Sequence, residues 1–151
     1  MDLVAMAHVI YLILSVLWIG LLIGVSFIAT PVKFLAPSLT RPVALDVGRV
    51  TFAIWNDIEW LVLALLVPPL VFMNIDHFSA VATFVLGILL LLQSAVLLPV
   101  LNERVMVIQS GKHPPSSADH RNYIVIDIVK LCILATIVWK QSGGIATLLA
   151  K

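Results

Sequence analysis

The sequence has few charged residues and one long stretch with none. Only 11% of its 151 residues are Asp, Glu, Lys or Arg, whereas about 25% is ordinary for a soluble domain. Hydrophobic residues make up 62% of the chain, and the mean hydropathy is +1.13. A soluble domain of this size could not bury so many apolar side chains, because much of a small protein must face water. The sequence therefore predicts an integral membrane protein whose main partner is the lipid bilayer.

Cysteine pairs and runs of basic residues are also missing. Cys132 is the single cysteine, which rules out an internal disulfide and the membrane thiol-redox enzymes that work through cysteine pairs. Nine Lys and Arg oppose eight Asp and Glu, which gives a formal net charge of +1. Nucleic-acid binding needs a concentrated basic surface, so we expect no nucleic-acid partner.

Four apolar stretches are long enough to cross a membrane as helices, which takes about 20 residues. They cover about residues 4–30, 52–73, 78–101 and 123–139. The first has no Asp, Glu, Lys or Arg between Leu3 and Val32. Pro68 and Pro69 predict a kink in the second, and the short polar stretch after it predicts a helical hairpin. We expect one all-α domain, an integral membrane bundle of four transmembrane helices.

The link between the first two spans carries helix signals of its own. Thr40 is suited to cap a helix, and Pro42 is suited to its first turn. These signals predict a short interfacial helix between the first two spans, lying at the membrane surface. The link from Ser110 to His120 contains Gly, Pro and Ser residues typical of a loop.

Basic residues in the links predict the orientation. In a four-span topology, one side of the membrane carries six Lys and Arg, and the other carries Lys140 and Lys151. The six are Lys33, Arg41, Arg49, Arg104, Lys112 and Arg121. Because basic links stay in the cytoplasm, we expect both termini on the non-cytoplasmic side of a bacterial inner membrane.

Polar and ionisable residues gather toward the cytoplasmic ends of the last three spans. Ionisable groups at membrane depth are costly, so each is a functional candidate with an expected partner. Asp127 and Lys130 are three residues apart, which suits an ion pair on one helix face. The predicted intramembrane polar cluster contains Asn56, Glu59, Gln93, Asn102, Glu103, Arg104, Asp127 and Lys130.

Three interpretations of this cluster stay open. Its charges either neutralise one another and hold the helix ends at the headgroup level, or they line a cytoplasm-facing cavity that binds a proton, an ion or a small solute. A catalytic carboxylate pair is the third interpretation, although no nucleophile, metal cluster or glycine-rich loop accompanies it. The leading hypothesis is a non-enzymatic membrane protein, acting as a small binding or transport component or as an accessory subunit of a larger assembly.

A second group of candidates lies at the opposite ends of the helices. Met6 and His8 begin the first span, and Met73 and His77 flank the turn after the second. Sulfur and imidazole are ligands that copper prefers, and His8 and His77 are the pair that could hold haem b inside a four-helix bundle. The alternative hypothesis is therefore a periplasm-facing copper- or haem-binding protein. Such residues near helix ends more often have packing roles.

Gly20 and Gly24 form a step of small residues in the first span. This spacing lets another helix approach closely. The partner helix belongs either to the same chain or to a second copy in a homo-oligomer.

Several motifs resemble a known membrane family. The first half contains W-x-G at Trp18, F-x-x-x-P-x-x-F from Phe27 and G-x-x-x-F from Gly48. The second half contains L-P-x-L-N-x-R from Leu98 and H-x-x-Y-x-x-x-D-x-x-K from His120. Over nearly its whole length the chain resembles bacterial four-helix membrane proteins of unknown function that are akin to the eukaryotic transmembrane proteins linked to cisplatin resistance. A more distant likeness, through W-x-G, is to the CopD-type copper-resistance family. The first resemblance implies a four-helix membrane fold, and the second implies periplasmic copper.

Overall fold

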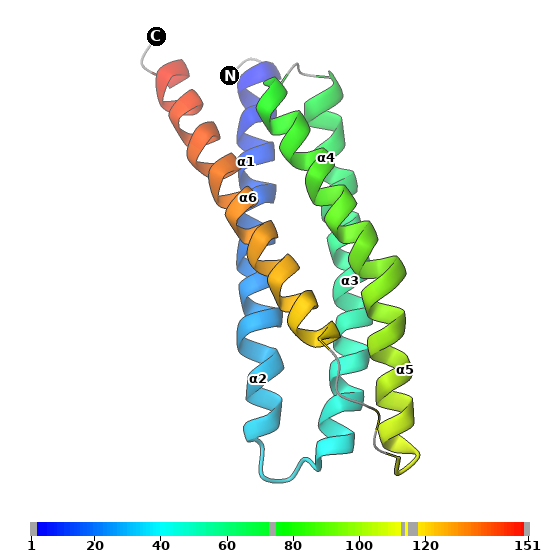
Figure 1. The fold of residues 1–151 in the computed structure, drawn as a ribbon. Coiled ribbons are helices and arrows are strands. Elements are labelled where there is room, and N and C mark those ends of the chain that lie inside the picture. The colour runs from blue at the N-terminus through cyan, green and yellow to red at the C-terminus, as the bar shows by residue number, and fades with distance from the viewer. Residues whose placement is uncertain (1–2, 73–74, 113, 115–117, 150–151) are drawn as a thin grey trace.

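A computed structural model describes residues 3–72, 75–112, 114 and 118–149. Every regular element in these ranges is helical, and the elements form four continuous rods (Figure 1). The first rod joins α1 (Leu3–Leu22), the π-helix η1 (Ile23–Ala29), α2 (Thr30–Val32) and the 3-10 turn η2 (Lys33–Leu35). The second is α3 (Arg41–Phe72) alone. The third joins α4 (His77–Leu92), the π-helix η3 (Gln93–Leu97) and α5 (Leu98–Gln109), and the fourth is α6 (Asp119–Leu149).

The rods pack as a four-membered bundle. α1 lies against α3 and α6, and α4 also lies against α3 and α6, so each long helix has two neighbours. Figure 1 shows both chain termini at one end, which we call the terminal end. The link after η2 and the end of α5 lie at the other end, which we call the basic end. α6 begins well short of the basic end, while α3 and α5 continue to it.

All four rods are long and apolar enough to cross a membrane. The candidate spans are Leu3–Leu35, Arg41–Val71, His77–Gln109 and Asp119–Gly144, with 33, 31, 33 and 26 residues. These lengths exceed the roughly 20 residues that the hydrocarbon core requires. The predicted architecture of four long apolar helices is therefore confirmed.

The predicted short interfacial helix is wrong. Arg41 begins α3 itself, and the helix continues without interruption to Phe72. Thr40 and Pro42 do mark a helix start, but no further proline lies between Pro42 and Phe52, and the helix tolerates the single glycine there, Gly48. The same signals therefore begin the second long helix about ten residues earlier than its hydropathy indicates.

Prolines shape the rods without ending them. α3 runs through Pro68 and Pro69, while Pro31 and Pro99 each follow directly after a π-helical segment and one further residue. A proline cannot donate to the carbonyl four residues back, and its ring clashes with it. In both places the residue before proline instead donates to the carbonyl five residues back, from Thr30 to Val25 and from Leu98 to Gln93. The wider turn accommodates the proline, and π-turns of this kind are frequent at functional sites.

The small-residue step does not receive another helix of this chain. A Cβ atom added at Gly20 or Gly24 would meet nothing within 4 Å among the described residues. The contact predicted within the chain is therefore not formed, which leaves the homo-oligomer alternative as a prediction.

The interior is apolar at most levels, and so is the outside. The core includes the fully buried side chains of Leu22, Leu66, Leu86, Leu90, Leu134 and Ile137. Large apolar residues such as Phe84, which is 70% exposed, cover the outer surface. Such a surface is unfavourable in water and is suited to contact with lipid tails.

Substitutions on two faces of α4 test this packing. Leu86→Ala removes a fully buried side chain and should destabilise the bundle by about 2–5 kcal/mol. Phe84→Ala, two residues away on the exposed face, should change the unfolding free energy by less than about 1 kcal/mol, because lipid or detergent replaces the lost contacts. Equilibrium unfolding in mixed micelles measures both, and equal effects would contradict the assigned faces.

Candidate functional site

A charged cluster lies completely buried between the rods. The Lys130 ammonium is 2.5 Å from Glu59 Oε1 on α3 and 3.1 Å from Asp127 Oδ1, one turn earlier on α6. All three side chains have no exposed surface. The ion pair predicted between Asp127 and Lys130 from their spacing is therefore present, and Glu59 joins it from another helix.

Two further side chains complete the cluster from the remaining rods. Gln93, the first residue of η3, donates from Nε2 to Asp127 Oδ1 (2.8 Å) and to the Tyr123 carbonyl (3.3 Å). The Trp18 indole on α1 donates to Glu59 Oε1 (3.0 Å). We call Trp18, Glu59, Gln93, Asp127 and Lys130 the charge cluster. Each of the four rods contributes at least one of these side chains.

The cluster holds more acidic than basic groups. Two carboxylates face one ammonium, so with all three ionised the net charge is −1. The oxygens Glu59 Oε2, Asp127 Oδ2 and Gln93 Oε1 are buried and have no hydrogen-bond partner among the described residues. A buried ion needs compensating charge and hydrogen bonds, since desolvation is otherwise very costly. The cluster therefore lacks one positive charge, and these three oxygens are the acceptors that are still unused.

The predicted polar cluster is divided in the structure. Four of its eight residues, Glu59, Gln93, Asp127 and Lys130, meet in the charge cluster. Asn56 forms a separate contact at the bundle surface, where its Oδ1 accepts a hydrogen bond from Ser94, which also accepts from the Trp60 indole.

The other three predicted residues lie nearer the basic end. Asn102 is nine residues beyond Gln93, about 13 Å along a helix, and Glu103 is exposed. Asn102 and Arg104 line a cavity of about 340 Å³. These residues therefore share a rod with Gln93 but lie at a different depth along it.

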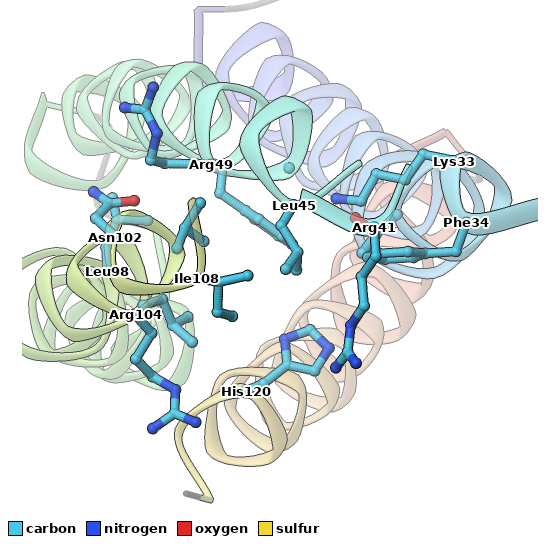
Figure 2. A pocket seen from close by; sticks show the side chains of 15 residues that line it. Lys33, Phe34, Arg41, Leu45, Arg49, Leu98, Asn102, Arg104, Ile108 and His120 are labelled. Atoms are coloured by element: carbon cyan, nitrogen blue, oxygen red, sulfur yellow. The ribbon is translucent and has the colours of Figure 1, made fainter. Parts of the chain in front are cut away.

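This cavity, which we call the basic cavity, lies toward the basic end and is lined by residues of all four rods (Figure 2). One of its lining residues is Phe52, whose ring packs edge-on against Tyr123 with centroids 5.0 Å apart. The Tyr123 carbonyl accepts from Gln93, so this aromatic pair connects the cavity wall to the charge cluster. The cavity is lined by Thr30, Lys33, Phe34, Arg41, Leu45, Gly48, Arg49, Phe52, Leu98, Leu101, Asn102, Arg104, Val105, Ile108 and His120.

A second polar network joins the rods at the terminal end. His8 Nδ1 donates to Gln141 Oε1 (2.7 Å), and Gln141 Nε2 donates to Ser79 Oγ (2.8 Å) and Asp76 Oδ2 (3.2 Å). Lys140 forms an ion pair with Asp76 at 2.5 Å. Asp76 also caps α4, because its Oδ1 accepts from the Ser79 backbone amide. These bonds join α1, α6 and the start of α4 at the terminal end.

The structure does not bring the described residues among the predicted metal or haem ligands together at one site. His8 is engaged with Gln141, Met6 is 40% exposed and His77 is exposed at the start of α4. Met73 lies outside the described residues. Among the described residues, no group of three or more His, Cys, Asp or Glu could hold a metal ion. Copper and haem b stay untested predictions without structural support.

Two aromatic residues that contact the polar side chains of the charge cluster were not predicted from the sequence. Trp18 and Tyr123 are ordinary core aromatics by pattern, yet the Trp18 indole binds Glu59 and the Tyr123 carbonyl binds Gln93. The sequence signal that could have found Trp18 is its position inside a span, since an indole N–H at that depth needs an acceptor.

No protein-family model, curated protein or solved structure matches this chain. The resemblance to the bacterial four-helix family therefore stays a prediction.

Removing the ammonium from the charge cluster tests its energetic role. Lys130→Met leaves two carboxylates without their cation and should destabilise the bundle by about 3–5 kcal/mol. Lys140→Met, which breaks a partly exposed ion pair, should cost less than about 1 kcal/mol. The double variant Lys130→Met, Glu59→Leu should recover part of the loss. Unfolding in mixed micelles measures all three, and equal costs for the two single variants would contradict the assignment.

The terminal network predicts a dependence of stability on pH. Partial burial alone would raise the pKa of Asp76, but hydrogen bonds from Lys140 and Ser79, with the Lys140 charge, outweigh it and hold the pKa below its ordinary value. The ionised form is thus favoured by folding, and its contribution is present above the unfolded pKa of about 3.9 and lost as pH falls through the lower folded pKa. Asp76→Asn should lower the Tm at pH 7, and the difference from the unaltered protein should vanish at acid pH. A difference that is the same at all pH values would contradict this.

Proposed function

We propose that this protein is a four-span membrane protein that binds an exchangeable proton at Glu59 and Asp127, and that it acts as a small proton-coupled transport component. The observation that carries the proposal is the pair of carboxylates around one ammonium, with no exposed surface and with one unpartnered oxygen on each acid. A net charge of −1 at this depth is expensive. One proton, shared between the two acids, removes it.

A proton fits the cluster better than a metal cation. The Lys130 ammonium already occupies the space between the carboxylates, and it would repel a second cation held close by. A proton becomes part of a carboxyl group and neutralises it without needing a set of ligands. Because both acids contact the same ammonium, the proposed proton is shared between them.

Polar side chains along α1 lie between the charge cluster and the terminal end. Ser15 and Tyr11 are fully buried on the face that also carries Trp18. The Ser15 hydroxyl donates to the Tyr11 carbonyl (2.8 Å), and the Tyr11 hydroxyl shares a 2.6 Å hydrogen bond with Thr83. The Tyr11 hydroxyl also donates to the carbonyl of Ser79 (3.3 Å), whose side chain belongs to the terminal network. Hydroxyl groups at helical spacing both donate and accept protons, so this face suits proton exchange.

The orientation follows from charge as part of the same proposal. Six basic residues lie in or near the link between the first two rods and the link between the last two: Lys33, Arg41, Arg49, Arg104, Lys112 and Arg121. The excess of basic residues on one side assigns that side to the cytoplasm. The terminal end, with both termini, then faces the non-cytoplasmic side of a bacterial inner membrane.

Proton flux into liposomes tests the proposal. Purified protein is reconstituted with a pH-sensitive dye inside, and flux is driven by a potassium diffusion potential. Glu59→Gln keeps the Lys130–Asp127 pair and removes one acid, so it should fold and lower the flux at least tenfold.

The matched control is Glu103→Gln, which makes the same chemical change at an exposed glutamate on α5. It should leave the flux unchanged. Equal flux for Glu59→Gln and the unaltered protein, or equal loss in both variants, would contradict the assigned site.

A further inference from the structure

The basic cavity combines an apolar floor with several basic groups. Lys33, Arg41, Arg49, Arg104 and His120 line it, and none of its fifteen lining residues, all of them described, is acidic. Arg49 is paired with Asp46 (2.9 Å), which is not a lining residue. In Figure 2 Leu45 and Ile108 lie toward the middle of the cavity, with Lys33, Arg41, Arg104 and His120 around them. The cavity therefore favours negative charge at its edge and hydrocarbon at its centre.

The position of the Lys33 ammonium is set by a glycine and two aromatic rings. A Cβ added at Gly48 would stand 2.1 Å from Lys33 Nζ, so the ammonium occupies the space that any larger side chain at this buried position would fill. The Nζ atom also lies 5.3 Å and 5.6 Å from the ring centroids of Phe34 and Phe52. No carboxylate of the described residues forms an ion pair with Lys33. The ammonium is thus held in place and remains open to an anion.

The cavity has the size and location of a ligand site. Its volume of about 340 Å³ lies in the range of small-molecule pockets, which starts near 300 Å³. Its lining comes from the first rod, α3, α5 and the first turn of α6, toward the basic end of the bundle. A second cavity of about 540 Å³ adjoins it, shares Arg41, Arg104 and Ile108, and adds Lys112.

We propose that the basic cavity binds an anionic amphiphile, that is, a phosphate or carboxylate headgroup carrying an alkyl chain. The headgroup contacts Lys33 and Arg41, because ammonium and guanidinium groups form charge-assisted hydrogen bonds to such anions. The alkyl chain lies against Leu45, Leu98 and Ile108. A fully polar anion would leave this apolar floor unused, and a cationic amphiphile would meet the wrong charge. This site is separate from the charge cluster and does not depend on the proposed proton function.

Binding of octyl phosphate to protein held in nanodiscs of phosphatidylcholine tests the chemical class. Thermal unfolding is followed at matched concentrations of octyl phosphate, inorganic phosphate and octyltrimethylammonium. A ligand that binds the folded state raises the Tm, and we expect the shift with octyl phosphate alone. A shift of the same size with inorganic phosphate would overturn the amphiphile, and one with octyltrimethylammonium would overturn the anion.

Three variants locate the site. Lys33→Gln removes the ammonium, and Gly48→Ala keeps it but displaces it, because a flexible side-chain end must move away from the new Cβ. Each should weaken octyl phosphate binding about tenfold, the effect of losing one charge-assisted hydrogen bond. Arg121→Gln makes the same charge change beside His120 at an exposed residue outside the lining, and it should bind normally. Equal weakening in all three variants, or none in the first two, would overturn the site.

Native mass spectrometry distinguishes the two sources of such an anion. Protein is released from nanodiscs containing equal amounts of phosphatidylglycerol and phosphatidylcholine. Retention of phosphatidylglycerol by the unaltered protein and its loss in Gly48→Ala identifies a membrane phospholipid as the occupant. Octyl phosphate binding without retained phosphatidylglycerol identifies a single-chain amphiphile. If neither octyl phosphate nor phosphatidylglycerol binds, the proposal is overturned.

Discussion

The cost of placing charge in a low-dielectric interior is the constraint on which this bundle depends. Lys130, Glu59 and Asp127 have no exposed surface, so their desolvation must be repaid by contacts with good geometry. Those contacts come from all four rods, through Trp18, Glu59, Gln93 and the α6 pair. The cluster therefore fixes the rotation and depth of each helix relative to the others, which apolar side chains alone specify poorly.

Polarity is arranged in three levels along the bundle. The terminal network of His8, Asp76, Ser79, Lys140 and Gln141 closes one end, and the charge cluster lies deeper between the rods. The basic cavity opens at the other end, below the Phe52–Tyr123 pair. Hydrogen bonds connect the charge cluster to the aromatic pair, since Gln93 donates to both Asp127 and the Tyr123 carbonyl. In the proposed function, the proton reaches the buried cluster from the terminal end along the Tyr11 face of α1.

Hydropathy and charge spacing predicted the fold because they report burial along a single helix. The four apolar runs, the Asp127–Lys130 pair and the inclusion of Glu59 and Gln93 all followed from such local rules. The interfacial helix was wrong because a cap marks where a helix begins and not where it ends, so Thr40 and Pro42 introduced α3 itself. Which polar residues meet depends on their depth along the rod and on the neighbouring helix. Asn102 and Arg104 were therefore predicted in the same cluster as Glu59 and Gln93, although they line the basic cavity. The sequence indicates a role for Lys33 in orientation alone, because its contact with Gly48 on the next rod depends on how the rods pack.

The protonation state of the Glu59–Asp127 pair at neutral pH tests most directly whether the buried charge cluster binds a proton. Infrared spectroscopy of the protein in lipid resolves the C=O stretch of a protonated carboxyl from the bands of carboxylates. We predict one protonated carboxyl per chain at pH 7 that Glu59→Gln removes and Glu103→Gln leaves in place. A spectrum at pH 7 with no protonated carboxyl would mean that the cluster carries its net negative charge unneutralised, and it would contradict the central claim.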